Sequence, residues 1–213
     1  MIRGALFDLD GTLVHTHIDF GAMKGAVLAI VAEAGVEVGP LRERDSLAIV
    51  REVRQRLGPE SVRFAAKCEA AMVACELAAL YGAEEAYDAA AFLAWLRRQG
   101  VRVGIVTRNS GVAVQMLLRR IPLAHDVLLT RDDVPRTKPD PIHLQMALER
   151  LGVAQADAIM VGDHPMDVVA GKAAGVRSIA VAHGKLDERA FEACPPDSFV
   201  RSFGELRALV AEL

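Results

Sequence analysis

The block Phe7-Asp8-Leu9-Asp10-Gly11-Thr12-Leu13-Val14 constrains this chain more than any other part of its sequence, because it directly follows a short apolar run. That run, Ile2 to Leu6, predicts a buried β-strand, and Gly11 allows a sharp turn after it. Two carboxylates two residues apart would then share one face at the carboxyl end of a strand, where α/β sheets bind ligands. Since such close carboxylates repel, we expect a cation between them or a proton on one. Asp-Gly-Thr alone is typical of a turn or helix cap; the whole block favours a reactive site.

Composition indicates a globular protein, with 213 residues of which 52% are hydrophobic and 25% charged. A net charge of −3 gives no sign of a nucleic-acid or membrane partner, although a small anionic substrate stays possible. Cys68, Cys75 and Cys194 form no CxxC pattern, so we expect neither a disulfide framework nor a zinc site. The strand follows Met1 too closely for a signal peptide, and the apolar stretch 26–32 is too short to cross a bilayer. We therefore predict a cytoplasmic monomer or homodimer.

The segment from about residue 19 to residue 81 predicts helices and almost nothing else. Asp19 can cap a helix that ends near Gly35, a second helix is expected over 41–57, and a third begins near Glu60. Five residues of the third helix recur at helical spacing and predict a packing face: Ala65, Cys68, Met72, Cys75 and Ala79. This segment is a helical insert.

From Ala83 onward, helices alternate with apolar strands, which is typical of a parallel sheet covered on both faces. Helices are expected over 85–99, beyond Ser110, over 141–151 and 167–174 and from Gly204. Strands are expected over 101–106, 126–130, 157–161 and 176–181 and near Phe199. The sequence thus predicts an α/β fold with a Rossmann-like, three-layer core. We expect residues 1–15 and 83–213 to form this core and residues 16–82 to form the helical insert.

Three further polar clusters lie between a predicted strand and the helix after it. They are Thr107-Arg108-Asn109-Ser110, the loop around Lys138, and Gly162-Asp163-His164-Pro165-Met166-Asp167. Each cluster alone is compatible with a cap, a turn or a solvated loop. Because the carboxyl ends of parallel strands share one edge, we expect all three to lie near Asp8 and Asp10.

In this order the four clusters resemble the motifs of the haloacid dehalogenase-like hydrolases, and within them the phosphatases related to phosphoglycolate phosphatase. The resemblance covers essentially the whole chain. Asp8-Leu9-Asp10-Gly11-Thr12 is similar to the first motif, Thr107 to the second, Lys138 to the third, and Asp163 with Asp167 to the fourth.

The resemblance implies a catalytic role for each of these residues. Asp8 would be the nucleophile that forms an aspartyl-phosphate, and Asp10 the general acid and base. Asp8, the backbone carbonyl of Asp10, and Asp163 would bind Mg²⁺, with Asp167 supporting the site. The helical insert would be the family's mobile cap domain.

Elementary electrostatics agrees with this reading. A carboxylate attacks a phosphate dianion only if positive charge offsets their repulsion, and Mg²⁺ binds a few carboxylates together with substrate oxygens. Lys138 adds positive charge as a catalytic residue. Thr107, with the backbone N–H groups of Arg108 and Asn109, can hold phosphate oxygens at a helix start. The Arg108 side chain can reach either the leaving group or the cap.

The sequence departs from the usual family pattern at three histidines. His15 stands where such phosphatases often carry an acidic residue, His17 follows at the expected hinge, and His164 replaces a small hydroxyl residue. Three roles stay open for these histidines: substrate choice, a solvated position at the hinge, and support of the metal site.

The expected activity is therefore Mg²⁺-dependent hydrolysis of a small phosphorylated metabolite, with phosphoglycolate as the first guess. A phosphomutase of the β-phosphoglucomutase kind would use the same residues. A dehalogenase is disfavoured by Asp10, and a phospho-aspartate signalling module by the helical insert. A noncatalytic binding protein is disfavoured because every expected catalytic position is filled.

Overall fold

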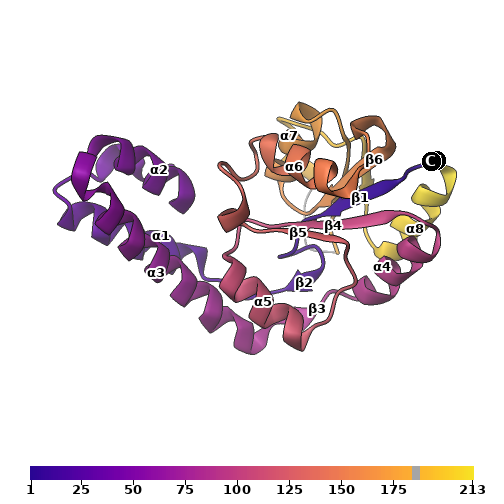
Figure 1. The fold of residues 1–213 in the computed structure, drawn as a ribbon, viewed down its shortest axis with the longest axis horizontal. Coiled ribbons are helices and arrows are strands. Elements are labelled where there is room, and N and C mark those ends of the chain that lie inside the picture. The colour runs from indigo at the N-terminus through magenta and orange to yellow at the C-terminus, as the bar shows by residue number, and fades with distance from the viewer. Residues whose placement is uncertain (184–187) are drawn as a thin grey trace. The chain divides into compact units, whose positions relative to one another are not determined.

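The computed structural model describes residues 1–183 and 188–213, and the chain divides into two compact units. One unit, which we call the core unit, comprises Met1–Thr16 and Ala83–Leu213. The other, the helical unit, comprises His17–Gly82. Figure 1 colours both along the chain, with the helical unit in indigo to purple.

A six-stranded parallel sheet forms the centre of the core unit, in the order β5-β4-β1-β6-β7-β8. Its strands are β1 (Gly4–Phe7), β4 (Arg102–Val106), β5 (Val127–Leu129), β6 (Ala158–Gly162), β7 (Arg177–Val181) and β8 (Ser198–Val200). β1 lies in the middle, where Phe7 pairs with Ile105 on one side and Val161 on the other. The predicted parallel α/β fold is confirmed.

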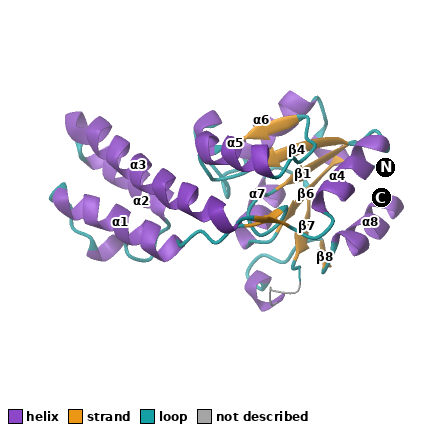
Figure 2. Cartoon of the chain, turned by 90° about the horizontal axis from the view of Figure 1, so that it is seen from below, coloured by secondary structure: helices purple, strands orange, loops and turns teal. Residues whose placement is uncertain are grey.

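Helices cover both faces of this sheet and complete three layers (Figures 1 and 2). α6 (Ile142–Leu151) and α7 (Pro165–Ala173) cover one face, and α6 contacts β1, β4 and β5. The other face carries α4 (Ala89–Arg98), α5 (Gly111–Arg120) and α8 (Phe203–Glu212). Crossovers between parallel strands are right-handed, so the direction in which a crossover runs along the sheet decides which face its helix covers. The crossovers through α4 and α5 run toward β5, and those through α6 and α7 run toward β8, so the two pairs of helices cover opposite faces.

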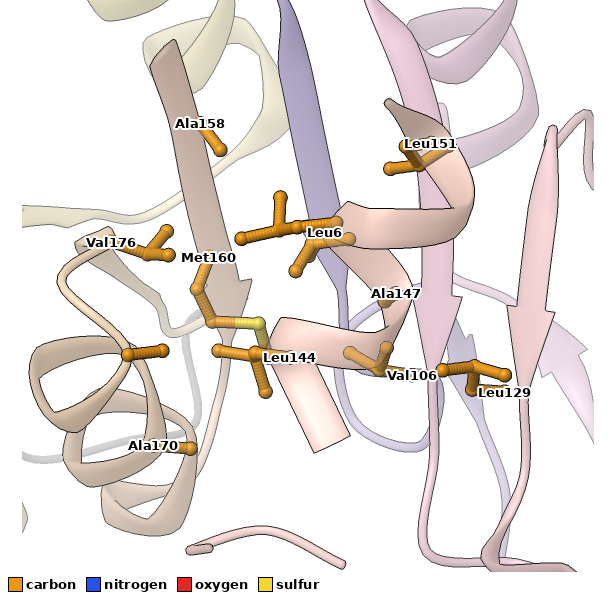
Figure 3. Close-up of a cluster of buried hydrophobic side chains, with 12 residues drawn as sticks. Leu6, Val106, Leu129, Leu144, Ala147, Leu151, Ala158, Met160, Ala170 and Val176 are labelled. Atoms are coloured by element: carbon orange, nitrogen blue, oxygen red, sulfur yellow. The ribbon is translucent and has the colours of Figure 1, made fainter. Parts of the chain in front are cut away.

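The apolar core beneath α6 and α7 fixes the sheet against these helices (Figure 3). Leu6, Val106 and Leu129 come from three neighbouring strands and meet Leu144 and Ala147 of α6. All five side chains are fully buried. Burial of each of the four leucine and valine side chains contributes roughly 1.5–3 kcal/mol, so this layer holds the strand ends that carry the polar clusters.

The helical unit consists of α1 (Phe20–Glu33), α2 (Ser46–Arg56) and α3 (Ser61–Ala79) around its own apolar core. As predicted, Asp19 caps α1, accepting a hydrogen bond from the Ala22 N–H at 2.8 Å. The second helix begins at Ser46, not at Leu41, because the Asp45 carboxylate caps its first N–H groups.

The predicted packing stripe of α3 is partly wrong. Its buried row consists of Phe64, Cys68, Met72, Glu76 and Ala79, whereas Ala65 and Cys75 are only half-buried. Burial raises the pKa of the Cys68 thiol to about 11, with a smaller contribution from Glu69. That thiol is therefore protonated at neutral pH and acts as a packing group.

The sequence missed one small sheet. β2 (Val14–His15) pairs antiparallel with β3 (Glu84–Glu85). These strands lie in the core unit, directly before and after the segment of chain that forms the helical unit. The helix predicted over 85–99 consequently begins only at Ala89. No helix within residues 1–183 and 188–213 is long and apolar enough to cross a membrane.

Candidate active site

The polar clusters lie where neighbouring strands of the sheet end. Asp8 follows β1, Thr107 follows β4, and Asp163 follows β6, so three adjacent strands each deliver one residue to the same edge. Lys138 comes from the loop between β5 and α6. The expected convergence of the four motifs follows from this strand order.

Lys138 bridges two of the carboxylates at this edge. Its Nζ lies 2.6 Å from Asp8 Oδ1 and 2.7 Å from Asp167 Oδ1, and only 2% of the residue is exposed. Burial alone would lower the pKa of Lys138, but the charges of Asp167 and Asp8 outweigh it and raise the pKa. Lys138 is therefore a buried cation held by two aspartates.

Asp163 joins this ion-paired group. One carboxylate oxygen from each of Asp8, Asp163 and Asp167 lies within 4.8 Å of the other two. Burial and the charges of Asp8 and Asp167 raise the pKa of Asp163 to about 8. Burial also raises the pKa of Asp167, to about 6, although the Lys138 charge opposes the rise. Three carboxylates share this space with one ammonium group, so the cluster carries excess negative charge.

Two glycines make room for these carboxylates. A Cβ on Gly11 would lie 2.0 Å from Asp163 Oδ2, and Gly11 has a φ of +81°, which other residues rarely adopt. A Cβ on Gly162 would lie 2.2 Å from Asp167 Oδ2. The turn after β1 and the end of β6 thus require glycine for the aspartates to pack this closely.

Asp10 has different neighbours from Asp8. Its Oδ2 accepts a hydrogen bond from Asn109 Nδ2 at 2.6 Å, and its Oδ1 accepts one from the Thr16 hydroxyl at 2.5 Å. β1 ends at Phe7, so strand alternation does not govern Asp8 and Asp10 as the sequence suggested. The carboxylates that cluster with Asp8 as possible metal ligands are those of Asp163 and Asp167.

The loop after β4 runs into α5. The Asn109 N–H donates to Thr107 Oγ1 at 3.2 Å, and Ser110 caps α5 by accepting from the Ala113 N–H at 3.3 Å. Arg108 extends toward the fourth motif, with Nη1 2.8 Å from Met166 Sδ. Thr107 and Asn109 therefore stand at a helix start beside the aspartates, which suits an anion.

His164 has a structural task in this site. Its Nδ1 accepts a hydrogen bond from the Met166 N–H at 3.1 Å, and its own N–H donates to Asp167 Oδ2 at 3.1 Å. His164 and Asp167 also form a capping box, so His164 caps the start of α7. The same Asp167 side chain thus holds Lys138 through Oδ1 and the helix start through Oδ2.

Several contributors were not foreseen from the sequence. The Thr12 hydroxyl donates to Asp163 Oδ1 at 3.3 Å, and His183 Nε2 lies 2.9 Å from the Thr12 carbonyl oxygen. The His183 ring also lies edge-on to the His15 ring, at a centroid distance of 5.7 Å. His183 comes from the loop after β7 and Thr16 from the end of the first core segment, so only the folded sheet brings them to this edge.

Comparison with known proteins assigns the family. The sequence profile of the haloacid dehalogenase-like hydrolases, described as a hydrolase family, matches residues 2–175. The chain belongs to this family. The resemblance inferred from the four motifs is therefore confirmed, and the protein is a hydrolase.

Relatives and solved structures agree with this assignment. Over 120 residues the chain is 37% identical to pyrophosphatase PpaX of Bacillus cereus (strain AH820), covering 55% of this chain and 56% of that protein. It thus spans about half the length of the curated relatives it matches. A hydrolase from Pseudomonas syringae superposes with a TM-score of 0.75 at 17% identity, over 100% of this chain and 99% of the other. An HAD phosphatase from Thermococcus onnurineus superposes with a TM-score of 0.65 at 25% identity, over 98% of each chain.

Proposed function

We propose that this protein is a Mg²⁺-dependent phosphatase that hydrolyses a small phosphorylated metabolite through an aspartyl-phosphate on Asp8. The observation that carries the proposal is the position of Lys138 Nζ, within 2.7 Å of both Asp8 and Asp167, while Asp163 offers a further carboxylate beside them. Family membership and the phosphatases among the relatives support it. A nucleophilic carboxylate beside fixed positive charge is what attack on a phosphate requires.

The donor set fits Mg²⁺. The three clustered aspartates supply hard oxygen ligands. With all three ionised they exceed the charge of Lys138 by two, and a divalent cation would balance that excess and keep Asp163 ionised despite its raised pKa. Asp8, Asp163 and the backbone carbonyl of Asp10 would hold the ion, with Asp167 beside them. When bound, it would supply positive charge against the phosphate oxygens.

Asp8 would act as the nucleophile and Asp10 as the general acid and base. A carboxylate oxygen of Asp8 forms a bond to phosphorus as the bond from phosphorus to the leaving oxygen breaks, and Asp10 gives that oxygen a proton. In the second step a water molecule attacks the same phosphorus, Asp10 takes the water's proton, and the Asp8 carboxylate is released with free phosphate. Asn109 and Thr16 hold the Asp10 carboxyl between them for both transfers.

Lys138 and the Thr107 loop bind the phosphoryl group. Lys138 offsets the Asp8 charge as the phosphate approaches, and it cannot turn away because Asp167 holds it. Thr107, Arg108 and Asn109 supply hydroxyl, guanidinium and backbone donors at the start of α5. The helical unit, as the cap, would select the substrate and exclude water.

Two substrate classes deserve direct comparison. Phosphoglycolate represents the small phosphomonoesters that the motif resemblance suggests. Inorganic pyrophosphate is the second candidate, because the curated relatives are pyrophosphatases and Arg108 adds a cation beside the expected phosphate site. A phosphomutase of the β-phosphoglucomutase kind would isomerise a sugar phosphate in place of releasing phosphate.

A phosphate-release screen with Mg²⁺ tests the proposal. The panel should contain phosphoglycolate, pyrophosphate, sugar phosphates and p-nitrophenyl phosphate, with the Asp8→Asn variant as the matched inactive control. We expect catalytic release from at least one phosphomonoester or from pyrophosphate. Isomerised sugar phosphate without released phosphate would favour the mutase, and no turnover of any compound by the folded protein would contradict a phosphatase.

A further inference from the structure

The turn after β5 holds the loop after β4. This turn, Arg131–Asp133, follows a strand that pairs directly with β4, so it lies beside the Thr107 loop. The Arg131 N–H donates to the Asn109 carbonyl at 3.0 Å, and Arg131 Nη1 donates to the Arg108 carbonyl at 3.2 Å. Asp132 Oδ2 accepts from the Gly111 N–H at 2.8 Å. The turn therefore contacts the backbone of three of the four residues 108–111.

These contacts fix the direction of two peptide groups. In a trans peptide the C=O and N–H point in opposite directions. Arg131 donates hydrogen bonds to the carbonyl oxygens of Arg108 and Asn109. The N–H groups of the same two peptides, those of Asn109 and Ser110, therefore face away from Arg131. The Asn109 N–H indeed points to Thr107 Oγ1, at 3.2 Å. Arg131 thereby sets the direction of these two N–H groups at the helix start where the phosphate would bind.

The same contacts position the Asn109 side chain. Arg131 binds the peptide carbonyl on each side of Asn109, and the Asn109 side chain donates to Asp10 Oδ2 at 2.6 Å. A rotation of either peptide would move Nδ2 away from Asp10. Arg131 thus connects the phosphate-binding loop, through Asn109, with the proposed general acid.

The turn is itself held in place. Asp133 Oδ2 accepts from the Thr130 N–H at 2.8 Å, as part of a capping box, and also from the Thr130 hydroxyl at 2.7 Å. Arg131 is half-buried, whereas the tip residues Asp132 and Asp133 are exposed. The Arg131 backbone is therefore anchored independently of its own side chain.

We propose that Arg131 is a positioning residue: its guanidinium and N–H fix the Arg108–Asn109–Ser110 peptides, so that phosphate meets the loop's N–H groups and Asn109 orients Asp10. This inference rests on the proposed phosphatase function. It assigns the second residue after β5, which the four motifs do not include, to the active-site apparatus.

Arg131→Met tests the role of the guanidinium, because it keeps the side-chain length and removes the donors. We expect the inhibition constant of inorganic phosphate to rise about tenfold, the effect of losing one charged hydrogen bond. The fall in kcat should be larger for an alkyl phosphate than for p-nitrophenyl phosphate, because only the alkyl leaving group needs the proton of Asp10. Arg131→Lys should recover part of both losses.

Arg119→Met is the matched control, because it makes the same chemical change at an exposed arginine near the end of α5. It should leave phosphate inhibition and both kcat values within about twofold. If Arg131→Met fails to fold, Asp132→Ala replaces it: this exposed residue anchors the Gly111 N–H, and its loss should also weaken phosphate inhibition.

Two results would overturn the inference. One is a folded Arg131→Met protein with unchanged phosphate inhibition. The other is an equal loss of kcat for the alkyl and nitrophenyl esters, which a merely structural residue would give. Failure of the phosphatase function would appear differently, as a wild-type protein that releases no phosphate; the Arg131 inference would then be judged by calorimetric binding of inorganic phosphate alone.

Discussion

The Nδ1 atom of His143 accepts a hydrogen bond from the backbone N–H of Lys138, at 3.3 Å. His143 is fully buried, and its Nε2 lies 3.3 Å from the Leu129 carbonyl oxygen at the end of β5. An imidazole that accepts at Nδ1 and donates at Nε2 is neutral. His143 therefore ties the lysine loop to the sheet in its uncharged form.

The protein should lose stability in acid through His143. Burial, followed by the charge of Lys138, lowers the pKa of His143 from 6.5 to about 4. The unfolded chain therefore binds this proton more readily, so the stabilising contribution is present above pH 6.5 and is lost as pH falls toward 4. At 1.36 kcal/mol per pKa unit, the loss is about 3 kcal/mol.

Urea unfolding of the wild type and His143→Asn at several pH values measures this contribution. Asparagine retains an acceptor near the Nδ1 position and does not titrate. The difference in unfolding free energy between the two proteins should shrink between pH 6.5 and pH 4. A constant difference over that range would show that His143 is not the acid-sensitive group.

Replacement of Lys138 should damage both folding and activity. Lys138→Met leaves the buried Asp167 and the part-buried Asp8 without their shared cation, which costs about 3–5 kcal/mol. Phosphate release should fall below detection. Lys172→Met, on the exposed part of α7, is the control and should change unfolding by less than about 0.5 kcal/mol. A Lys138→Met protein as stable as this control would contradict the described ion pairs.

Asp10→Asn should separate substrates by their leaving groups. The amide retains the size of the side chain but cannot give or take a proton. With an alkyl phosphate we expect a loss of about 10²–10⁴ in kcat, whereas p-nitrophenyl phosphate should show a burst of nitrophenolate and then slow turnover. The burst arises because the second step still needs Asp10 as a base. Equal first-step losses for both esters would argue against Asp10 as the acid.

Activity should depend on added Mg²⁺. Treatment with a chelator should stop phosphate release, Mg²⁺ should restore it, and Ca²⁺ should restore it poorly because Ca²⁺ takes a larger and less regular oxygen shell. Thermal unfolding provides a readout apart from activity: Mg²⁺ should raise the midpoint of the wild type more than that of Asp163→Asn. Full activity in excess chelator would exclude the metal-dependent mechanism.

The sequence predicted the sheet well because its strands are short apolar runs separated by amphipathic helices. All six parallel strands were expected, and the motif residues after β1, β4 and β6 converge because these strands are neighbours. The β2–β3 pair was missed because each strand has only two residues and no apolar alternation. The start of α2 was misplaced because Asp45 competes as a cap with the preceding Gly39-Pro40 turn.

The partners of the motif residues were much harder to predict. Thr16, Arg131 and His143 are ordinary polar residues in sequence, and each acquires its role from a partner that only the fold supplies. His143 stood five residues after Lys138, at the start of an expected helix, so only its closeness in sequence pointed to the lysine loop. Nothing comparable in the sequence connects Arg131 to Asn109, 22 positions earlier, because strand pairing sets that distance.

The most direct test of the central claim is the rate of phosphate release by Asp8→Asn. Asparagine keeps the shape of the side chain that Lys138 contacts, but it is a poor nucleophile and a weaker metal ligand. The variant should unfold cooperatively, like the wild type, and should release phosphate at least about 10³-fold more slowly. A folded Asp8→Asn protein whose activity lies within about tenfold of the wild type would contradict Asp8 as the nucleophile.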